Sequence, residues 1–142
     1  MTRIVVGVDG SPASEAALHW AFGQAMATGA SIHVVMSWDE HPLLSSVSET
    51  IGGAGVPPEA VEEQAHGLLD VTIAAATPDA STVTVTKEAV SGAPDDVLVA
   101  AAETADLLVV GRTARAGLFH MGSVSTSVAK RAACPVVVVP GR

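Results

Sequence analysis

The sequence predicts an α/β fold, a doubly wound parallel sheet of five strands in the order 3-2-1-4-5 with helices on both faces. Three observations lead to this prediction. Strand-like apolar runs alternate with amphipathic helical stretches in the order βαβαβαβαβ. Most of the runs lack polar alternation, which is typical of strands buried in a parallel sheet. The length of 142 residues and the apolar content of 49% suit one domain over 1–142 with a covered sheet.

The first helix shows how the elements are recognised. Residues 3–8 (RIVVGV) are apolar and β-branched, as expected for a central strand. Ser11 can cap the free amides of a helix, Pro12 presets φ at its first position, and Gly29 can end it. The expected strands are 3–8, 31–38, 81–88, 106–111 and 135–139, and the expected helices are 12–28, 59–76, 94–104 and 123–133.

The later elements follow the same rules. Residues 39–58 are rich in Pro and Gly, which predicts a long loop. Residues 81–88 (STVTVTKE) alternate Val and Thr, the pattern of a half-exposed strand at a sheet edge. The helix over 94–104 begins with acids at its positive end, and the helix over 123–133 ends with bases at its negative end.

Composition and charge exclude several classes of protein. The formal net charge of -8 disfavours binding to DNA, RNA or anionic lipid. The apolar runs are strand-sized, so no membrane span is expected. The single cysteine, Cys134, excludes an internal disulfide, and the first strand begins directly after Thr2, which leaves no room for a signal peptide. We therefore expect a cytoplasmic protein. The five histidines have no metal-ligand spacing, so no metal site is expected.

Two segments far apart in the sequence are expected to meet at the carboxyl edge of the sheet, where such folds bind ligands. One follows the first strand, and the other runs from the fourth strand into the last helix. Phosphate binding needs glycines, converging backbone N–H groups and a helix N-terminus, and a carboxylate can bind ribose hydroxyls. The pairing therefore predicts a nucleotide site. Its candidate residues are Val8, Asp9, Gly10, Ser11, Gly111, Arg112, Arg115, Gly117, Gly122, Ser123 and Val124.

The charged candidates have separate expected roles. Arg112 and Arg115 could offset phosphate charge through bidentate hydrogen bonds, while Asp9 suits the sugar or base end. A simpler interpretation stays open, in which residues 9–11 form only a turn and helix cap and the arginines are solvated loop charges.

These motifs identify a resemblance. The segments RIVVGVDGSPASEAALHWA, VVMSW, DLLVVG, GSVSTSVAKRA and CPVVVV make the chain resemble the universal stress protein family over essentially its whole length. The resemblance implies a nucleotide-binding α-hydrolase-like fold, ATP as the ligand, with Mg²⁺ as a candidate bridge between phosphates, and a homodimer. The last strands, residues 135–139 (PVVVV), would pair in that dimer. An apolar edge strand covered by a symmetry mate also avoids aggregation.

The resemblance also assigns roles to residues. It implies that Asp9 contacts the nucleoside, that backbone near Ser37 meets the adenine, and that Gly111, Gly122 and Ser123 cradle the phosphates.

The glycine loop departs from the family pattern. ATP-binding members read Gly-x-x-Gly, nine residues, then Gly-Ser or Gly-Thr. Here Ala114 replaces the second glycine, and only residues 115–121 separate it from Gly122, so the loop is two residues short. Two hypotheses follow. The first is a stress or regulatory protein that binds an adenine nucleotide, and the alternative is a dimeric interaction module of the same fold that has lost its nucleotide.

An enzyme is not expected, beyond slow ATP hydrolysis at most. The chain lacks a Gly-Lys-Ser/Thr phosphate loop, and no general base is paired with a nucleophile.

Overall fold

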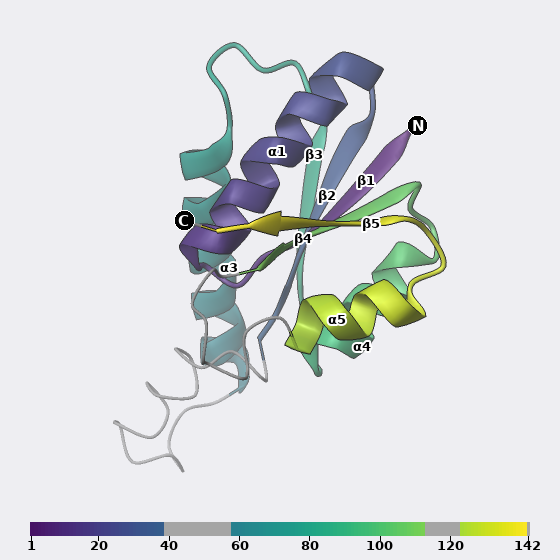
Figure 1. The fold of residues 1–142 in the computed structure, drawn as a ribbon. Helices are drawn as coiled ribbons and strands as arrows, with labels where there is room; N and C mark the ends of the chain where they lie inside the picture. Colours follow the sequence, from purple (N-terminus) through teal and green to yellow (C-terminus); the bar gives the residue numbers. More distant parts are fainter. Residues whose placement is uncertain (39–57, 113–122, 142) are drawn as a thin grey trace.

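The computed structural model describes residues 1–38, 58–112 and 123–141. The predicted loop over 39–58 lies almost wholly outside these residues. The described elements, in chain order, are β1 (Arg3–Gly7), α1 (Pro12–Thr28), β2 (Ser31–Ser37), α3 (Pro58–Ala76), β3 (Val85–Val90), α4 (Pro94–Ala102), β4 (Leu107–Arg112), α5 (Ser123–Arg131) and β5 (Val136–Pro140) (Figure 1).

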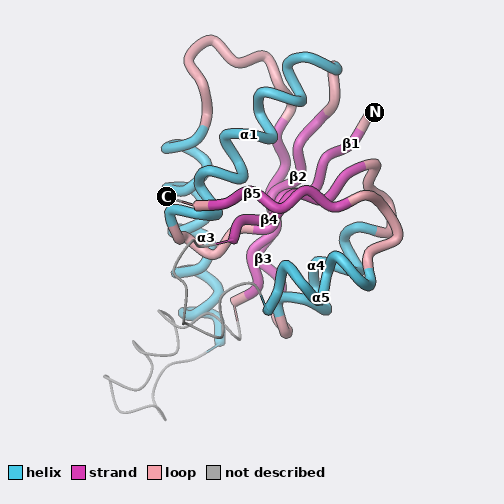
Figure 2. The backbone as a smooth tube through the Cα atoms, viewed as in Figure 1, coloured by secondary structure: helices cyan, strands magenta, loops and turns pink. Residues whose placement is uncertain are grey.

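The five strands form one sheet in the order β3-β2-β1-β4-β5, and every neighbouring pair is parallel, so the predicted topology is confirmed (Figure 2). β1 lies at the centre. Its residues pair with β2 from Arg3↔Ser31 onward and with β4 from Ile4↔Leu107 onward. Successive strands are added outward from β1 on one side and from β4 on the other. The strand order therefore reverses between β1 and β4, which is where ligands bind in open α/β sheets.

Helices cover both faces of the sheet, as predicted. α1 and α3 lie on one face and α4 and α5 on the other (Figure 1). Each face has its own core. Phe22 and Leu18 of α1 are fully buried in the first, and Leu98 of α4 and Val128 of α5 are buried in the second. No described helix is long and apolar enough to cross a membrane.

The predicted ends of α1 are confirmed. The Ser11 hydroxyl accepts a hydrogen bond from the Ser14 N–H at 3.2 Å, and Pro12 occupies the first turn. At the other end Gly29 has φ +78°, in the left-handed region that favours glycine, and its N–H donates to the Ala25 carbonyl at 2.8 Å. Local sequence signals are enough to place this helix.

The strand β3 lies at a sheet edge as predicted, but its bounds differ from the expected 81–88. The reason is the register with β2, in which Val85 pairs with Ile32 and Val90 pairs with Ser37. The Val/Thr alternation before Val85 therefore lies ahead of the point where β2 begins, and the ladder extends through two residues that carry no alternation. A strand needs a partner as well as a pattern.

The helices α4 and α5 end at Ala102 and Arg131, two residues before their expected ends. After Ala102 the chain tightens, because the Glu103 and Ala105 N–H groups each donate to a carbonyl three residues earlier.

The amino edge of the sheet is tied together by one carboxylate. Asp106 precedes β4, and its Oδ2 accepts hydrogen bonds from the Thr2 N–H at 2.8 Å, the Thr2 hydroxyl at 2.9 Å and the Arg3 N–H at 2.9 Å. These bonds favour the charged form and lower the pKa of Asp106 to about 2, with the Thr2 N–H making the largest contribution.

Candidate functional site

The loop after β1 is shaped by short-range hydrogen bonds. The Ser11 N–H donates to Asp9 Oδ1 at 2.9 Å, and the Asp9 N–H donates to Ser14 Oγ at 3.3 Å. Ser14 Oγ in turn donates to the Ser11 carbonyl at 2.9 Å. Residues 9–11 therefore do form the turn and helix cap of the simpler interpretation. The Asp9 side chain remains exposed at the carboxyl edge, so the turn does not remove it from a ligand's reach.

Gly10 brings a residue of α3 to this loop that the sequence did not single out. Its φ is +83°, and a Cβ at this position would lie 3.0 to 3.2 Å from three carbon atoms of the Leu68 side chain. Leu68 is half-buried and packs against the first core cluster. It therefore forms an apolar wall beside Asp9-Gly10. Its only signal in the sequence is membership of the apolar stripe of α3, which does not indicate what it faces.

The first and second strands end beside this loop. Val8 is only 5% exposed, and its N–H donates to the Val35 carbonyl at 3.0 Å, so its side chain belongs to the core. The Ser37 hydroxyl donates to the Gly92 carbonyl and so ties the end of β2 to the turn before α4. The Trp38 N–H donates to the Val90 carbonyl at 3.1 Å. The Ser37 hydroxyl is thus engaged within the fold.

Glycine is needed at position 111 for a packing reason that the sequence did not reveal. A Cβ there would lie 2.4 Å from the Ala13 carbonyl oxygen and 2.5 Å from its carbonyl carbon. Gly111 is thus required where the first turn of α1 crosses β4. Gly141 is also buried, and a Cβ there would lie 2.7 Å from Ala13 Cβ. Arg112, the last residue of β4, is exposed, and its carbonyl accepts a hydrogen bond from the Gly141 N–H at 2.6 Å.

Part of the predicted phosphate loop falls outside the described residues, namely Arg115, Gly117 and Gly122, together with Ala114. Description resumes with the backbone of Ser123, which begins α5, while its side chain is not described. Val124 is half-buried and packs against the second core cluster. Because α5 precedes β5, whose Val136 pairs with Leu108 near the amino end of β4, α5 runs from the carboxyl edge to the amino edge.

The structure therefore gathers one part of the predicted site at the carboxyl edge. Asp9, Gly10 and Ser11 lie after β1, Ser37 ends β2, and Gly111 and Arg112 end β4. The ends of β1 and β4 are neighbours, because Gly7 pairs with Val110. Within the described residues, no group of three His, Cys, Asp or Glu side chains is placed to hold a metal ion.

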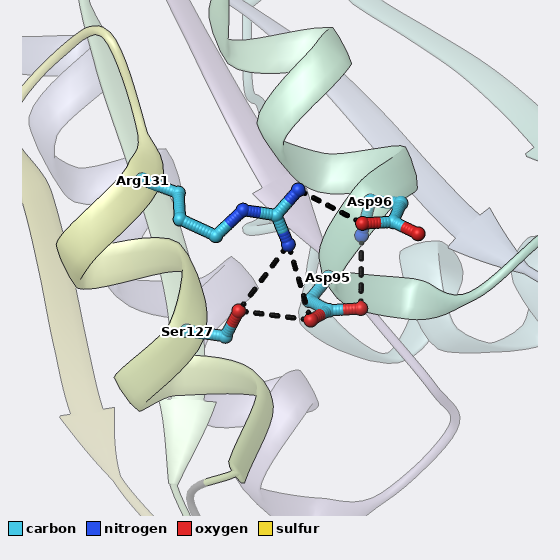
Figure 3. A network of polar contacts seen from close by, with 4 residues as sticks. All are labelled: Asp95, Asp96, Ser127 and Arg131. Carbon is cyan, nitrogen blue, oxygen red and sulfur yellow. Dashed lines mark hydrogen bonds and ion pairs between the residues drawn. The ribbon is translucent and has the colours of Figure 1, made fainter.

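A polar network of Asp95, Asp96, Ser127 and Arg131 joins α4 to α5 (Figure 3). The Ser127 hydroxyl donates to Asp95 Oδ2 at 2.8 Å, and the Arg131 guanidinium donates to the same oxygen at 3.2 Å and to Asp96 Oδ1 at 2.8 Å. Asp95 Oδ1 accepts the Asp96 N–H at 3.0 Å. The hydrogen bond from Ser127 is the main cause that lowers the pKa of Asp95, opposed by partial desolvation. Only the spatial pairing of the two helices reveals this network.

Comparison with known proteins agrees with this architecture. The model of the universal stress protein family matches residues 1–140. The universal stress protein Rv2005c of Mycobacterium tuberculosis is 34% identical over 137 residues, which cover 95% of this chain and 44% of that protein. Another from that organism, Rv1996, is 31% identical over 137 residues. The chain thus spans less than half the length of these curated relatives.

Solved structures share the fold along nearly the whole chain. A universal stress protein in complex with cAMP matches with a TM-score of 0.62 and 25% identity, covering 99% of this chain and 98% of that one. The universal stress protein of Archaeoglobus fulgidus in complex with dAMP matches with a TM-score of 0.69 and 23% identity, covering 98% of both chains. A family protein of Arabidopsis thaliana with AMP bound matches with a TM-score of 0.66 and 20% identity, covering 100% of this chain and 93% of that one. On its sequence and its fold, this chain belongs to the universal stress protein family.

Proposed function

We propose that this protein binds an adenine nucleotide, with ATP as the preferred form, at the carboxyl edge of its sheet between β1 and β4, and that it acts in the cytoplasm as a stress-response or regulatory protein. The observation that carries the proposal is the meeting of the Asp9 loop and the end of β4 at the position where the strand order reverses. The cAMP-bound structure, which is 25% identical to this chain, supports an adenine nucleotide as the ligand class.

In this proposal, a different set of residues contacts each part of the nucleotide. The exposed Asp9 carboxylate accepts hydrogen bonds from ribose hydroxyls, and the half-buried Leu68 offers an apolar surface beside it. Backbone groups near Ser37 contact the adenine. The phosphates bind at the N-terminus of α5, because the first N–H groups of a helix have no partners within it. The other phosphate contacts come from Arg112, Arg115, Gly117 and Gly122. Mg²⁺ bridging between the phosphates is part of the proposal for ATP.

Equilibrium dialysis with labelled ATP, AMP and cyclic AMP tests this function. We expect saturable binding of ATP that excess unlabelled AMP displaces. The test variant is Gly122→Val, in which the added side chain should block the approach of a phosphate to the backbone. The wild-type chain is its control. Unaltered ATP affinity in that variant would contradict the assignment of the phosphate site.

A second candidate is a dimeric interaction module that does not bind nucleotide. The Ala114 substitution and the shortened loop favour it, because both reduce the room for a triphosphate. In either case we propose a homodimer through residues 135–139. The edge position of β5 and its half-buried valines support that proposal. Sedimentation at micromolar concentration tests it, and a single species of 14.2 kDa would contradict it.

We propose that the protein is not an enzyme, with slow ATP hydrolysis as the upper limit. A phosphate-release assay on the purified chain measures this directly. Release of phosphate from bound ATP at a rate typical of dedicated ATPases would overturn the proposal.

A further inference from the structure

The helix α5 is held on the molecule in two different ways. Its underside packs on the sheet through Val124 and Val128, and Val128 is fully buried. Apolar contacts of this kind are non-directional, so on their own they leave a short helix free to shift along its axis. The Ser127–Asp95 hydrogen bond is directional. This bond therefore fixes the position of α5 along its own axis.

Asp95 is suited to this task because each of its oxygens holds a different helix. Oδ1 accepts the Asp96 N–H and so is tied to the first turn of α4, while Oδ2 accepts the Ser127 hydroxyl and the Arg131 guanidinium of α5. The Asp96 carboxylate accepts a hydrogen bond from the Arg131 guanidinium at the last residue of α5. Both aspartates thus contact Arg131 at the end of α5, and Asp95 also contacts Ser127 at the middle of the helix.

The contact at Ser127 lies at the middle of α5, one turn from the end of the helix that faces the carboxyl edge. Ser127 lies four residues after Ser123, about 6 Å along the helix axis. A shift of α5 by a fraction of an ångström at Ser127 is transmitted to its first N–H groups, because a helix is stiff over one turn. Hydrogen bonds to a phosphate weaken steeply with distance and angle.

We propose that Asp95 is a positioning residue for the phosphate end of the nucleotide, which it serves by fixing the first turn of α5 through Ser127 without touching the ligand. This inference rests on the proposed function. The pKa of Asp95 is lowered mainly by its hydrogen bond from Ser127, so its carboxylate is charged at neutral pH.

The sign of the effect separates positioning from simple electrostatics. A carboxylate repels a phosphate, so the loss of negative charge alone predicts tighter binding when either Asp95 or Asp96 is removed. Positioning predicts the opposite for Asp95 only. It also predicts that the loss is confined to ligands that carry a phosphate, because the nucleoside end contacts β1 and β2.

The experiment measures adenosine and AMP affinity by titration calorimetry on the wild-type chain, Asp95→Ala and the matched control Asp96→Ala. For Asp95→Ala we expect AMP to bind about 10-fold more weakly, within the usual range of coupling energies, while adenosine affinity stays within about twofold. For Asp96→Ala we expect AMP affinity to be unchanged or increased. Asp95→Asn keeps an acceptor for Ser127 and should restore most of the AMP affinity.

A second measurement works without ligand. Amide hydrogen exchange should be faster at residues 127–130, the first N–H groups of α5 with partners within the helix, in Asp95→Ala than in Asp96→Ala, with unchanged protection in β1 and β4 as evidence of an intact fold. Equal exchange in the two variants, equal changes in AMP affinity, or a parallel loss of adenosine would each overturn the proposal. If the wild-type chain bound neither ligand, the proposed function itself would fail, and the exchange result would show whether Asp95 still fixes α5.

Discussion

Asp106 and Asp9 lie at opposite edges of the sheet, and their carboxylates have different structural roles. Asp106 sits before β4 and binds three donors from Thr2 and Arg3, which are distant in sequence. Asp9 sits after β1, and its Oδ1 accepts an N–H only two residues away. Both side chains are exposed. The amino edge thus uses its carboxylate to join two strands, whereas the carboxyl edge uses its carboxylate to shape a loop and leaves it near the proposed ligand.

The largest expected effect tests whether the carboxyl edge is purely functional. Gly111→Ala places a methyl group within 2.4 Å of the Ala13 carbonyl oxygen, so backbone must move. We expect it to lower the free energy of unfolding by about 3 kcal/mol. Gly23→Ala is the control, because nothing lies within 4 Å of a Cβ there and the change should be neutral or stabilising. Urea unfolding measures both, and equal stability of the two variants would contradict the close approach of α1 to β4.

The next effect concerns the Asp9 carboxylate, which lies near the proposed ligand. Asp9→Ala should weaken binding of adenosine and AMP alike by about 10-fold, because a charge-assisted hydrogen bond to the ribose is lost. The free energy of unfolding should fall by no more than about 1 kcal/mol, since the hydrogen bond from the Ser11 N–H is exposed and spans only two residues. Calorimetry with both ligands gives the affinities. A loss restricted to AMP would show that Asp9 acts at the phosphate end instead.

The carboxylate at the amino edge is tested by pH. Because the pKa of Asp106 is lowered to about 2 from an ordinary value of 3.8, its contribution to stability is fully present above pH 4. It is lost as the pH falls through about 2, since the folded state then gains the proton that the unfolded state had already bound. Asp106→Asn should reduce the fall in the free energy of unfolding over this acidic pH range and leave nucleotide affinity unchanged. An identical acid profile in the variant would show that the three hydrogen bonds do not stabilise the charged form.

The smallest effect concerns a thiol near the same edge. Burial raises the pKa of Cys134, and the negative charge of Asp106 adds to the rise. We expect iodoacetamide to alkylate Cys134 at pH 8 more slowly than it alkylates an unfolded control, and Asp106→Asn to increase the rate slightly. Mass spectrometry follows the reaction. A rate equal to that of the unfolded chain would mean that the thiol is not shielded.

The sequence predicted those parts of the molecule that depend on neighbours along the chain. The strand order, the cap at Ser11, the end of α1 at Gly29 and the edge position of β3 all follow from local patterns and the general rules of parallel sheets. The bounds of β3 could not be predicted, because they depend on where β2 begins.

The candidate site was predictable in its location and only partly in its contents. Asp9 and Gly10 were identified from their motif. The approach of Leu68 to Gly10 and the contact of Asp95 with Ser127 were not predicted, because each joins residues that are far apart in the sequence. Gly111 was identified for phosphate approach, and its close contact with Ala13 appears only once α1 is packed on β4.

The contact between Gly141 and Ala13 has a consequence for synthesis of the chain. The first turn of α1 can complete its packing only after residue 141 has left the ribosome, since both Gly111 and Gly141 press against it. During translation the nascent protein therefore exposes an incomplete β1–α1 unit until β5 arrives, a period in which a chaperone can bind it. Completion of the packing around the Asp9 loop is in this way tied to completion of β5.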